Sequence, residues 1–143
     1  MRLTILPYRK AIIYEPQVKT LALRIFSSSH KNKEKRKLVN SELYQKISEY
    51  YFDDLFVNDS PNELFSGDLA RRMLNDVEKS INSCEEILIH CVLGKSRSPA
   101  VGIALNEIYN LGDDSQKLKN QFPNFNERVY QILIQENIKT LLT

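Results

Sequence analysis

The strongest constraint on the fold is an apolar run that ends in a cysteine and leads through one loop into a helix start. Residues 86–91, EILIHC, have the composition of a short buried strand. Ser98 followed by Pro99 has the pattern of a helix N-cap and first helical position, and an apolar run continues from Val101. A strand that feeds directly into a helix is typical of a parallel sheet covered by helices. This segment therefore favours an α/β fold.

The rest of the chain supplies further strands and helices. We expect strands at 2–6, 20–26 and 50–53, and helices at 38–47, 68–82, 98–111, 113–120 and 125–141. The helix at 68–82 has a clear apolar stripe, because Leu69, Met73 and Val77 recur at helical spacing. The alternation predicts one α/β domain over residues 1–143, with a central four- to five-stranded, mainly parallel sheet and helices on both faces.

Composition limits the partners that this chain can have. Lys and Arg total 20 against 18 Asp and Glu, and this net charge of +2 gives no support to nucleic acid or membrane partners. No apolar run reaches the roughly 18–20 residues that span a bilayer. Residues 1–16 lack the continuous apolar core of a secretory signal, so we expect a cytoplasmic protein. The two cysteines, Cys84 and Cys91, make neither a disulfide framework nor a metal site.

The loop from Cys91 to Arg97 has the composition of an anion site. Gly94 lets the backbone turn and approach a ligand closely, and the amides of residues 92–96 lie before a helix N-terminus, where anions bind. The guanidinium of Arg97 can bind two oxyanion atoms at once. A thiolate at Cys91 would be stabilised by the same groups and would act as a nucleophile. After the nucleophile has formed a covalent intermediate, the sulfur must leave as a thiolate, and the hydroxyl of Ser98 can stabilise it in that step.

The segment HCVLGKSRS at 90–98 resembles the His-Cys-x2-Gly-x-Ser-Arg-Ser signature of the dual-specificity branch of the protein tyrosine phosphatases. It is most similar to the small stand-alone bacterial proteins of that superfamily. YYFDDL at 50–55 resembles the acid-bearing segment of those proteins, and Pro123-Asn124-Phe125 resembles their Pro-Asn element, so the likeness spans roughly residues 48–135. It implies hydrolysis of phosphate monoesters through a phosphocysteine, without metal or cofactor. Phosphotyrosine in proteins or peptides is the implied substrate, with phosphoserine and phosphothreonine as further ones.

The resemblance also implies an aspartate that protonates the leaving group. Asp53, Asp54 and Asp59 are the candidates. Asp54 is the first choice because it ends the aromatic strand and would project toward the loop, and Asp53 is the second. Asp59 stays open because the interval from Asp54 to Cys91 is a few residues longer than is usual in this branch.

The individual loop positions carry further expectations. Val92, Leu93, Gly94, Lys95, Ser96 and Arg97 are expected to bind the phosphate. Leu93 departs from the small residue that is common there in the family. His90 is expected to hold the backbone of Cys91, and proton transfer by His90 is the alternative. A nucleotide-binding P-loop around Lys95 is excluded, because its first glycine would fall at Ile89.

Other functions of the same loop remain alternatives. One is a phosphatase of phosphoinositide, RNA or sugar phosphates, although Val92 stands where phosphoinositide phosphatases carry a basic residue. A second is a module that binds phosphorylated partners without turnover. A third is an arsenate reductase or sulfurtransferase, which would need reactive thiols beyond Cys84. Cys84 could also form a reversible disulfide with Cys91. The stretch HKNKEKRK at 30–37 is either a solvated loop or a rim that attracts anionic substrates, and the sequence predicts no oligomeric state.

Overall fold

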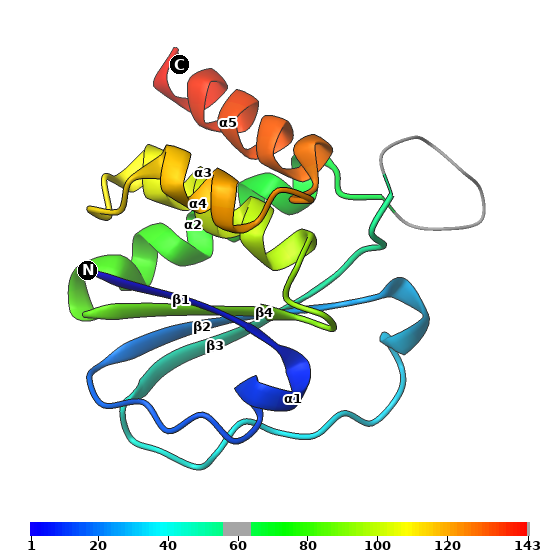
Figure 1. Cartoon of the computed structure of the whole chain (residues 1–143), viewed down its shortest axis with the longest axis vertical. Helices are drawn as coiled ribbons and strands as arrows, with labels where there is room; N and C mark the ends of the chain where they lie inside the picture. The colour runs from blue at the N-terminus through cyan, green and yellow to red at the C-terminus, as the bar shows by residue number, and fades with distance from the viewer. Residues whose placement is uncertain (56–63, 143) are drawn as a thin grey trace.

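The computed structural model describes residues 1–55 and 64–142, and within them four parallel strands form one sheet (Figure 1). The strands are β1 (Arg2–Pro7), β2 (Thr20–Phe26), β3 (Tyr44–Tyr51) and β4 (Glu86–Cys91), in the spatial order β1-β4-β2-β3. Each neighbouring pair is parallel. All residues of the internal strand β4 are buried, as expected for an apolar run inside a parallel sheet. The predicted α/β class and parallel sheet are therefore confirmed.

Helices cover the two faces of the sheet unequally. The longer helices α2 (Gly67–Ser80), α3 (Arg97–Tyr109) and α5 (Glu127–Leu141) lie with α4 (Ser115–Gln121) on one side of the sheet, and α1 (Tyr8–Ala11) lies on the other (Figure 1). The larger core packs α2, α3 and α5 against alternate side chains of β2 and β4, such as Leu23 and Ile89. The second face has a smaller core, in which Ala11 and Leu38 pack on the sheet. Among the residues that the structure describes, the four-residue α1 is the only α-helix on that face, so the expectation of helices on both faces is met there by one short helix. Short 3-10 turns, η1 (Ser28–His30) and η2 (Ile81–Ser83), complete the elements.

The helix predicted at 38–47 is wrong. Residues 38–43 contain only a turn, and β3 begins at Tyr44 and includes the start of the strand predicted at 50–53. The charged side chains of Lys46 and Glu49 are exposed on β3, which is an edge strand and pairs only with β2 among the described residues. Pairing with β2 buries Ser48 and Tyr50 and decides the structure against the local helix preference.

A buried carboxylate ties the first residues of the sheet together. Glu86 is fully buried at the start of β4, and its Oε2 accepts hydrogen bonds from the hydroxyls of Thr4 (2.6 Å) and Tyr14 (2.5 Å). Its Oε1 accepts from Thr20 Oγ1 at 2.9 Å. The carboxylate therefore links β1, β2 and the segment after α1 without a cationic partner among these contacts.

No helix in the described part of the chain is both long enough and apolar enough to cross a bilayer.

Candidate functional site

The loop between β4 and α3 folds around the sulfur of Cys91. Cys91 ends β4 and is only 2% exposed. Its Sγ accepts a hydrogen bond from the amide of Gly94 at 3.2 Å and lies 3.1 Å from the hydroxyl of Ser98. Because the strands are parallel, this loop lies at the carboxyl edge of the sheet, where ligands of open α/β sheets bind. The sulfur is thus held by groups that can hydrogen-bond to a thiolate.

Gly94 is required at its position by both conformation and space. Its φ is +69°, a backbone conformation that side chains with a Cβ rarely adopt. A Cβ there would lie 2.7 Å from the backbone nitrogen of Pro7 and 2.9 Å from the carbonyl carbon of Leu6. The end of β1 therefore packs directly on the loop, and the amide of Tyr8 also donates to the carbonyl of Val92 at 3.1 Å.

Most other amides of the loop are available to a ligand. The amides of Val92, Leu93, Lys95, Ser96 and Arg97 have no acceptor among the residues that the structure describes. Unpaired amides in a strand–loop–helix connection form the kind of concavity that binds anions.

The guanidinium of Arg97 is anchored on one nitrogen only. Nη1 donates to the carbonyl of Phe52 at 2.9 Å and to the hydroxyl of Ser27 at 3.2 Å. Nε and Nη2 have no partner within the described ranges, and Arg97 is 7% exposed. The residues after β2 and β3 therefore fix the guanidinium while leaving the three N–H donors of Nε and Nη2 for an oxyanion.

The candidate acids differ in their contacts. Oδ1 of Asp54 accepts from the hydroxyl of Ser96 at 2.6 Å, so this carboxylate lies against the loop. Asp53 instead accepts from the backbone amide (3.0 Å) and hydroxyl (2.6 Å) of Ser28. Asp59 lies outside the described residues. Of the two described candidates, the geometry brings Asp54 to the loop and directs Asp53 toward the segment after β2.

Asn126 is a site residue that the sequence did not reveal. Its side chain is fully buried, and Nδ2 donates to Oδ1 of Asp54 at 2.8 Å and to the carbonyl of Leu55 at 3.2 Å. Its Oδ1 caps α5 by accepting from the amide of Val129, and its backbone amide donates to the carbonyl of Ser96 at 3.1 Å. One residue thus joins the acid segment, the loop and the start of α5. The Pro-Asn element pointed two residues upstream, to Asn124, which is exposed.

Arg24 was also missed, although a single cation within an apolar strand was a signal. It is 3% exposed, and its Nε donates to Nε2 of His90 at 2.9 Å. The proton of the neutral imidazole therefore sits on Nδ1. Burial, and then the Arg24 cation, lower the pKa of His90 to about 3, and an interaction with the backbone of Cys91 partly opposes this shift. His90 is consequently neutral near pH 7, while its Nδ1 has no hydrogen-bond partner of good geometry in the described part of the chain.

Cys84 cannot form the suggested disulfide with Cys91. Cys91 is the last residue of the six-residue strand β4, and Cys84 lies two residues before its first residue, Glu86. The five extended steps of the strand separate its two ends by about 16 Å at the usual rise per residue. A disulfide needs Cα atoms roughly 4.4–6.8 Å apart. Cys84 is buried, and this burial raises the pKa of its thiol.

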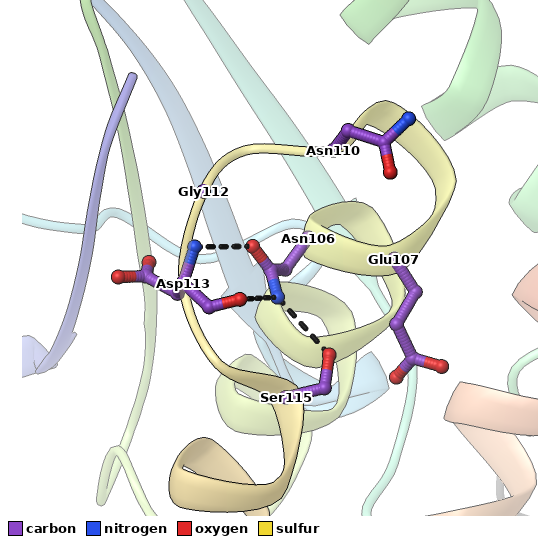
Figure 2. A pocket seen from close by; sticks show the side chains of 6 residues that line it. All are labelled: Asn106, Glu107, Asn110, Gly112, Asp113 and Ser115. Atoms are coloured by element: carbon purple, nitrogen blue, oxygen red, sulfur yellow. Dashed lines mark hydrogen bonds between the residues drawn. The ribbon is translucent and has the colours of Figure 1, made fainter.

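A hollow of about 370 Å³ lies at the carboxyl end of α3, away from the loop (Figure 2). Asn106 uses its whole amide there: Nδ2 donates to the carbonyl of Asp113 and the hydroxyl of Ser115, and Oδ1 accepts from the amide of Asp113. Figure 2 shows these bonds closing the turn that contains Gly112. Since both N–H donors and the oxygen of its amide are engaged within this turn, Asn106 holds the connection to α4.

Comparison with known proteins gives matches of structure only. No protein-family model and no curated protein match the sequence. A human tyrosine phosphatase-like serine/threonine/tyrosine-interacting protein superposes with a TM-score of 0.60 at 19% identity, over 99% of this chain and 93% of that chain. The archaeal protein Tk-PTP in its active form superposes with a TM-score of 0.55 at 14% identity, over 97% of this chain and 93% of that chain.

Proposed function

We propose that this chain, which has the fold of the protein tyrosine phosphatases in its small, dual-specificity-like form, is a cysteine-dependent phosphatase. Its proposed substrates are phosphate monoesters in proteins or peptides, phosphotyrosine first and phosphoserine and phosphothreonine as well. One observation carries the proposal: the sulfur of Cys91 is hydrogen-bonded inside a loop of unpaired amides that ends on the anchored Arg97. That arrangement combines a nucleophile with a site for a dianion.

In the first step, the thiolate of Cys91 attacks phosphorus and the bond from phosphorus to the ester oxygen breaks. The loop amides and Arg97 bind the three non-bridging oxygens, whose charge they stabilise in the transition state. Asp54, in its protonated form, gives its proton to the departing oxygen, so that an alcohol or phenol leaves. Its contact with Ser96 supports this role because it holds the carboxyl group beside the loop.

In the second step, water attacks the phosphocysteine and gives its proton to the carboxylate of Asp54. The bond from sulfur to phosphorus breaks, the electron pair returns to Cys91, and inorganic phosphate leaves. The hydroxyl of Ser98, 3.1 Å from the sulfur, donates to the departing thiolate. Each residue is regenerated, and the sequence of steps assigns no part to a metal ion or cofactor.

Hydrolysis of an aryl phosphate and of a phosphotyrosine peptide in the presence of a chelator tests the proposal. We expect Cys91→Ser to abolish turnover and Arg97→Ala to lower kcat by about 10²–10³-fold, as when a transition-state donor is removed. Asp54→Asn should lower kcat by roughly 10²–10⁴-fold. It should also remove the fall of kcat at high pH that reports loss of the proton from the general acid. Asp53→Asn is the matched control and should keep that fall.

The outcomes separate the alternatives. Full activity in Cys91→Ser would overturn the mechanism. A large loss of kcat in Asp53→Asn or Asp59→Asn, with no loss in Asp54→Asn, would assign the general acid to that other aspartate and leave the rest of the mechanism unchanged. Tight binding of the phosphopeptide without turnover by the wild-type chain would identify a phospho-binding module, and turnover of phosphoinositide, RNA or sugar phosphates alone would change the substrate class.

A further inference from the structure

Residues 27–37, SSSHKNKEKRK, form one side of the site, and we call this segment the basic wall. Its first residue, Ser27, accepts a hydrogen bond from Nη1 of Arg97 at 3.2 Å. Its second, Ser28, donates twice to the carboxylate of Asp53, which directly precedes Asp54. The basic stretch seen in the sequence therefore begins at the residues that hold the guanidinium and the acid segment.

The far end of the basic wall is also fixed. The backbone amide of Arg36 donates to the hydroxyl of Tyr8 at 3.0 Å, and its carbonyl accepts from Nη2 of Arg24 at 2.6 Å. The ammonium of Lys35 lies 4.7 Å from the ring centre of Tyr51 and donates to the carbonyls of His30 and Lys33 at 3.0 Å. These contacts give the segment a defined position before any substrate binds.

The charge of the basic wall is concentrated and unpaired. It contains five Lys and Arg and one Glu, so its net charge is +4; because the whole chain carries +2, all other residues together carry −2. Lys31, Lys33, Arg36 and Lys37 are exposed, and none of them has an ion pair among the described residues. An unneutralised cationic segment beside an anion site raises the local concentration of anionic substrates.

Hollows lie on both sides of the basic wall. One, of about 340 Å³, is lined by Tyr8, Phe26 and Val92, and Val92 directly follows the nucleophile. The wall adds His30, Lys35 and the carboxylate of Glu34 to this lining. The other, of about 350 Å³, is lined by Lys31 and Arg72 and has no carboxylate in its lining. The first offers apolar surface to a side chain next to the phosphorylated residue, and the second offers two cations.

We infer that the basic wall makes the enzyme selective for phosphorylated residues that are flanked by acidic side chains in a protein or peptide. The inference rests on the proposed phosphatase function and adds the substrate class. A short acidic peptide fits the charge distribution better than an extended polyanion. RNA or an anionic membrane would also contact residues outside the basic wall, and these carry a net negative charge that repels a polyanion.

The test compares two phosphotyrosine peptides of equal length, one with acidic flanks and one with the matching amides. The variant Lys31→Ala/Lys33→Ala/Lys37→Ala removes three cations and spares Lys35 and Arg36, whose contacts fix the wall. We expect wild-type kcat/KM to favour the acidic peptide by roughly 5–30-fold at low salt, as three partly screened charge contacts allow. The variant should lose most of this preference while hydrolysing a small aryl phosphate within about twofold of wild type.

The control variant Lys46→Ala/Lys79→Ala/Lys117→Ala removes the same charge from exposed lysines outside the wall, which have no ion pair within the described residues. It should keep the preference, and raising the salt from about 0.05 M to 0.5 M should reduce the preference of wild type. Equal preferences in the two triple variants would overturn the inference, because net charge alone would then explain the effect.

Binding distinguishes a failure of the inference from a failure of the proposed function. If wild type does not hydrolyse the aryl phosphate, the proposed function fails. The selectivity can still be measured as the affinity for the two peptides of Cys91→Ser, with and without the three substitutions of the wall lysines. The inference is overturned if the wall variant binds both peptides as the parent does. It is also overturned if removal of the wall lysines weakens binding to single-stranded RNA or phosphatidylserine vesicles but not to the acidic peptide.

Discussion

Replacing Gly94 by alanine should destabilise the fold considerably more than the same change at Gly112. Both glycines have positive φ, +69° and +104°, so an added Cβ strains the backbone at either position by about 1–3 kcal/mol. At Gly94 the Cβ would also lie 2.7 Å from Pro7 N and 2.9 Å from the carbonyl carbon of Leu6. At Gly112 nothing lies within 4 Å. Gly112→Ala therefore measures the loss of stability that comes from backbone strain alone, without a steric clash.

The contact with β1 should add about 1–3 kcal/mol at Gly94, the usual cost of forcing extra volume into a packed interior. The colliding atoms belong to the backbone of a strand paired with β4, so they cannot move aside as a flexible side chain would. Gly94→Ala should thus lower the free energy of unfolding by about 2–6 kcal/mol in total. Because the amide of Gly94 donates to the sulfur of Cys91, the folded fraction of this variant should also have a lower kcat.

Equilibrium unfolding in urea measures both changes, with an unchanged m-value as the check that only stability differs. The rate of aryl phosphate hydrolysis is then measured at a temperature where both variants are folded. If Gly94→Ala is no less stable than Gly112→Ala, β1 yields freely and the close approach does not constrain the loop. If stability falls but kcat is retained, the loop keeps the amide of residue 94 on the sulfur of Cys91 in spite of the strain, and the expected displacement of that amide is refuted.

Three further predictions follow from buried polar groups. Because burial and Arg24 lower the pKa of His90 to about 3, the unfolded chain binds a proton below about pH 6.5 that the folded chain does not. The free energy of unfolding should therefore fall with decreasing pH, with a slope approaching about 1.4 kcal/mol per pH unit. Urea unfolding between about pH 6.5 and 5 measures this slope, which should be smaller in His90→Gln than in wild type. Asn126→Ser keeps a capping oxygen for α5 but removes the side-chain amide that holds Asp54, so kcat should fall. This variant should be more stable than Asn126→Ala, which loses about 1 kcal/mol with the cap. A wild-type kcat in Asn126→Ser would contradict the positioning role of Asn126. Glu86→Leu leaves the hydroxyls of Thr4 and Tyr14 without their acceptor, while Thr20 keeps the carbonyl of Val18. The free energy of unfolding should fall by at least about 2 kcal/mol, and a loss below about 1 kcal/mol would show that the two hydroxyls find other partners.

The sequence by itself was sufficient where local chemistry decides the structure. The apolar run of β4, the glycine turn and the start of α3 lie within fourteen consecutive residues, 86–99, and the structure reproduces this strand–loop–helix order. The predicted N-cap Ser98 is wrong by two residues, because α3 begins at Arg97 with Ser96 as its N-cap. The helix predicted at 68–82 corresponds to α2, whose N-cap Ser66 accepts from the amide of Leu69. These features depend on periodicity, capping and backbone freedom, which neighbouring residues determine almost alone.

Tertiary structure decided the features that join distant segments. Residues 44–49 became a strand because β2 offered hydrogen bonds and a buried face, which outweighed the local preference for a helix. The register of β2 against β4 places Arg24 beside His90, and the packing of α5 brings Asn126 onto Asp54. The basic wall lies beside Arg97 for the same reason. The position of each of these groups depends on which strands pair and how helices pack, so no pattern within its own segment could predict its partner.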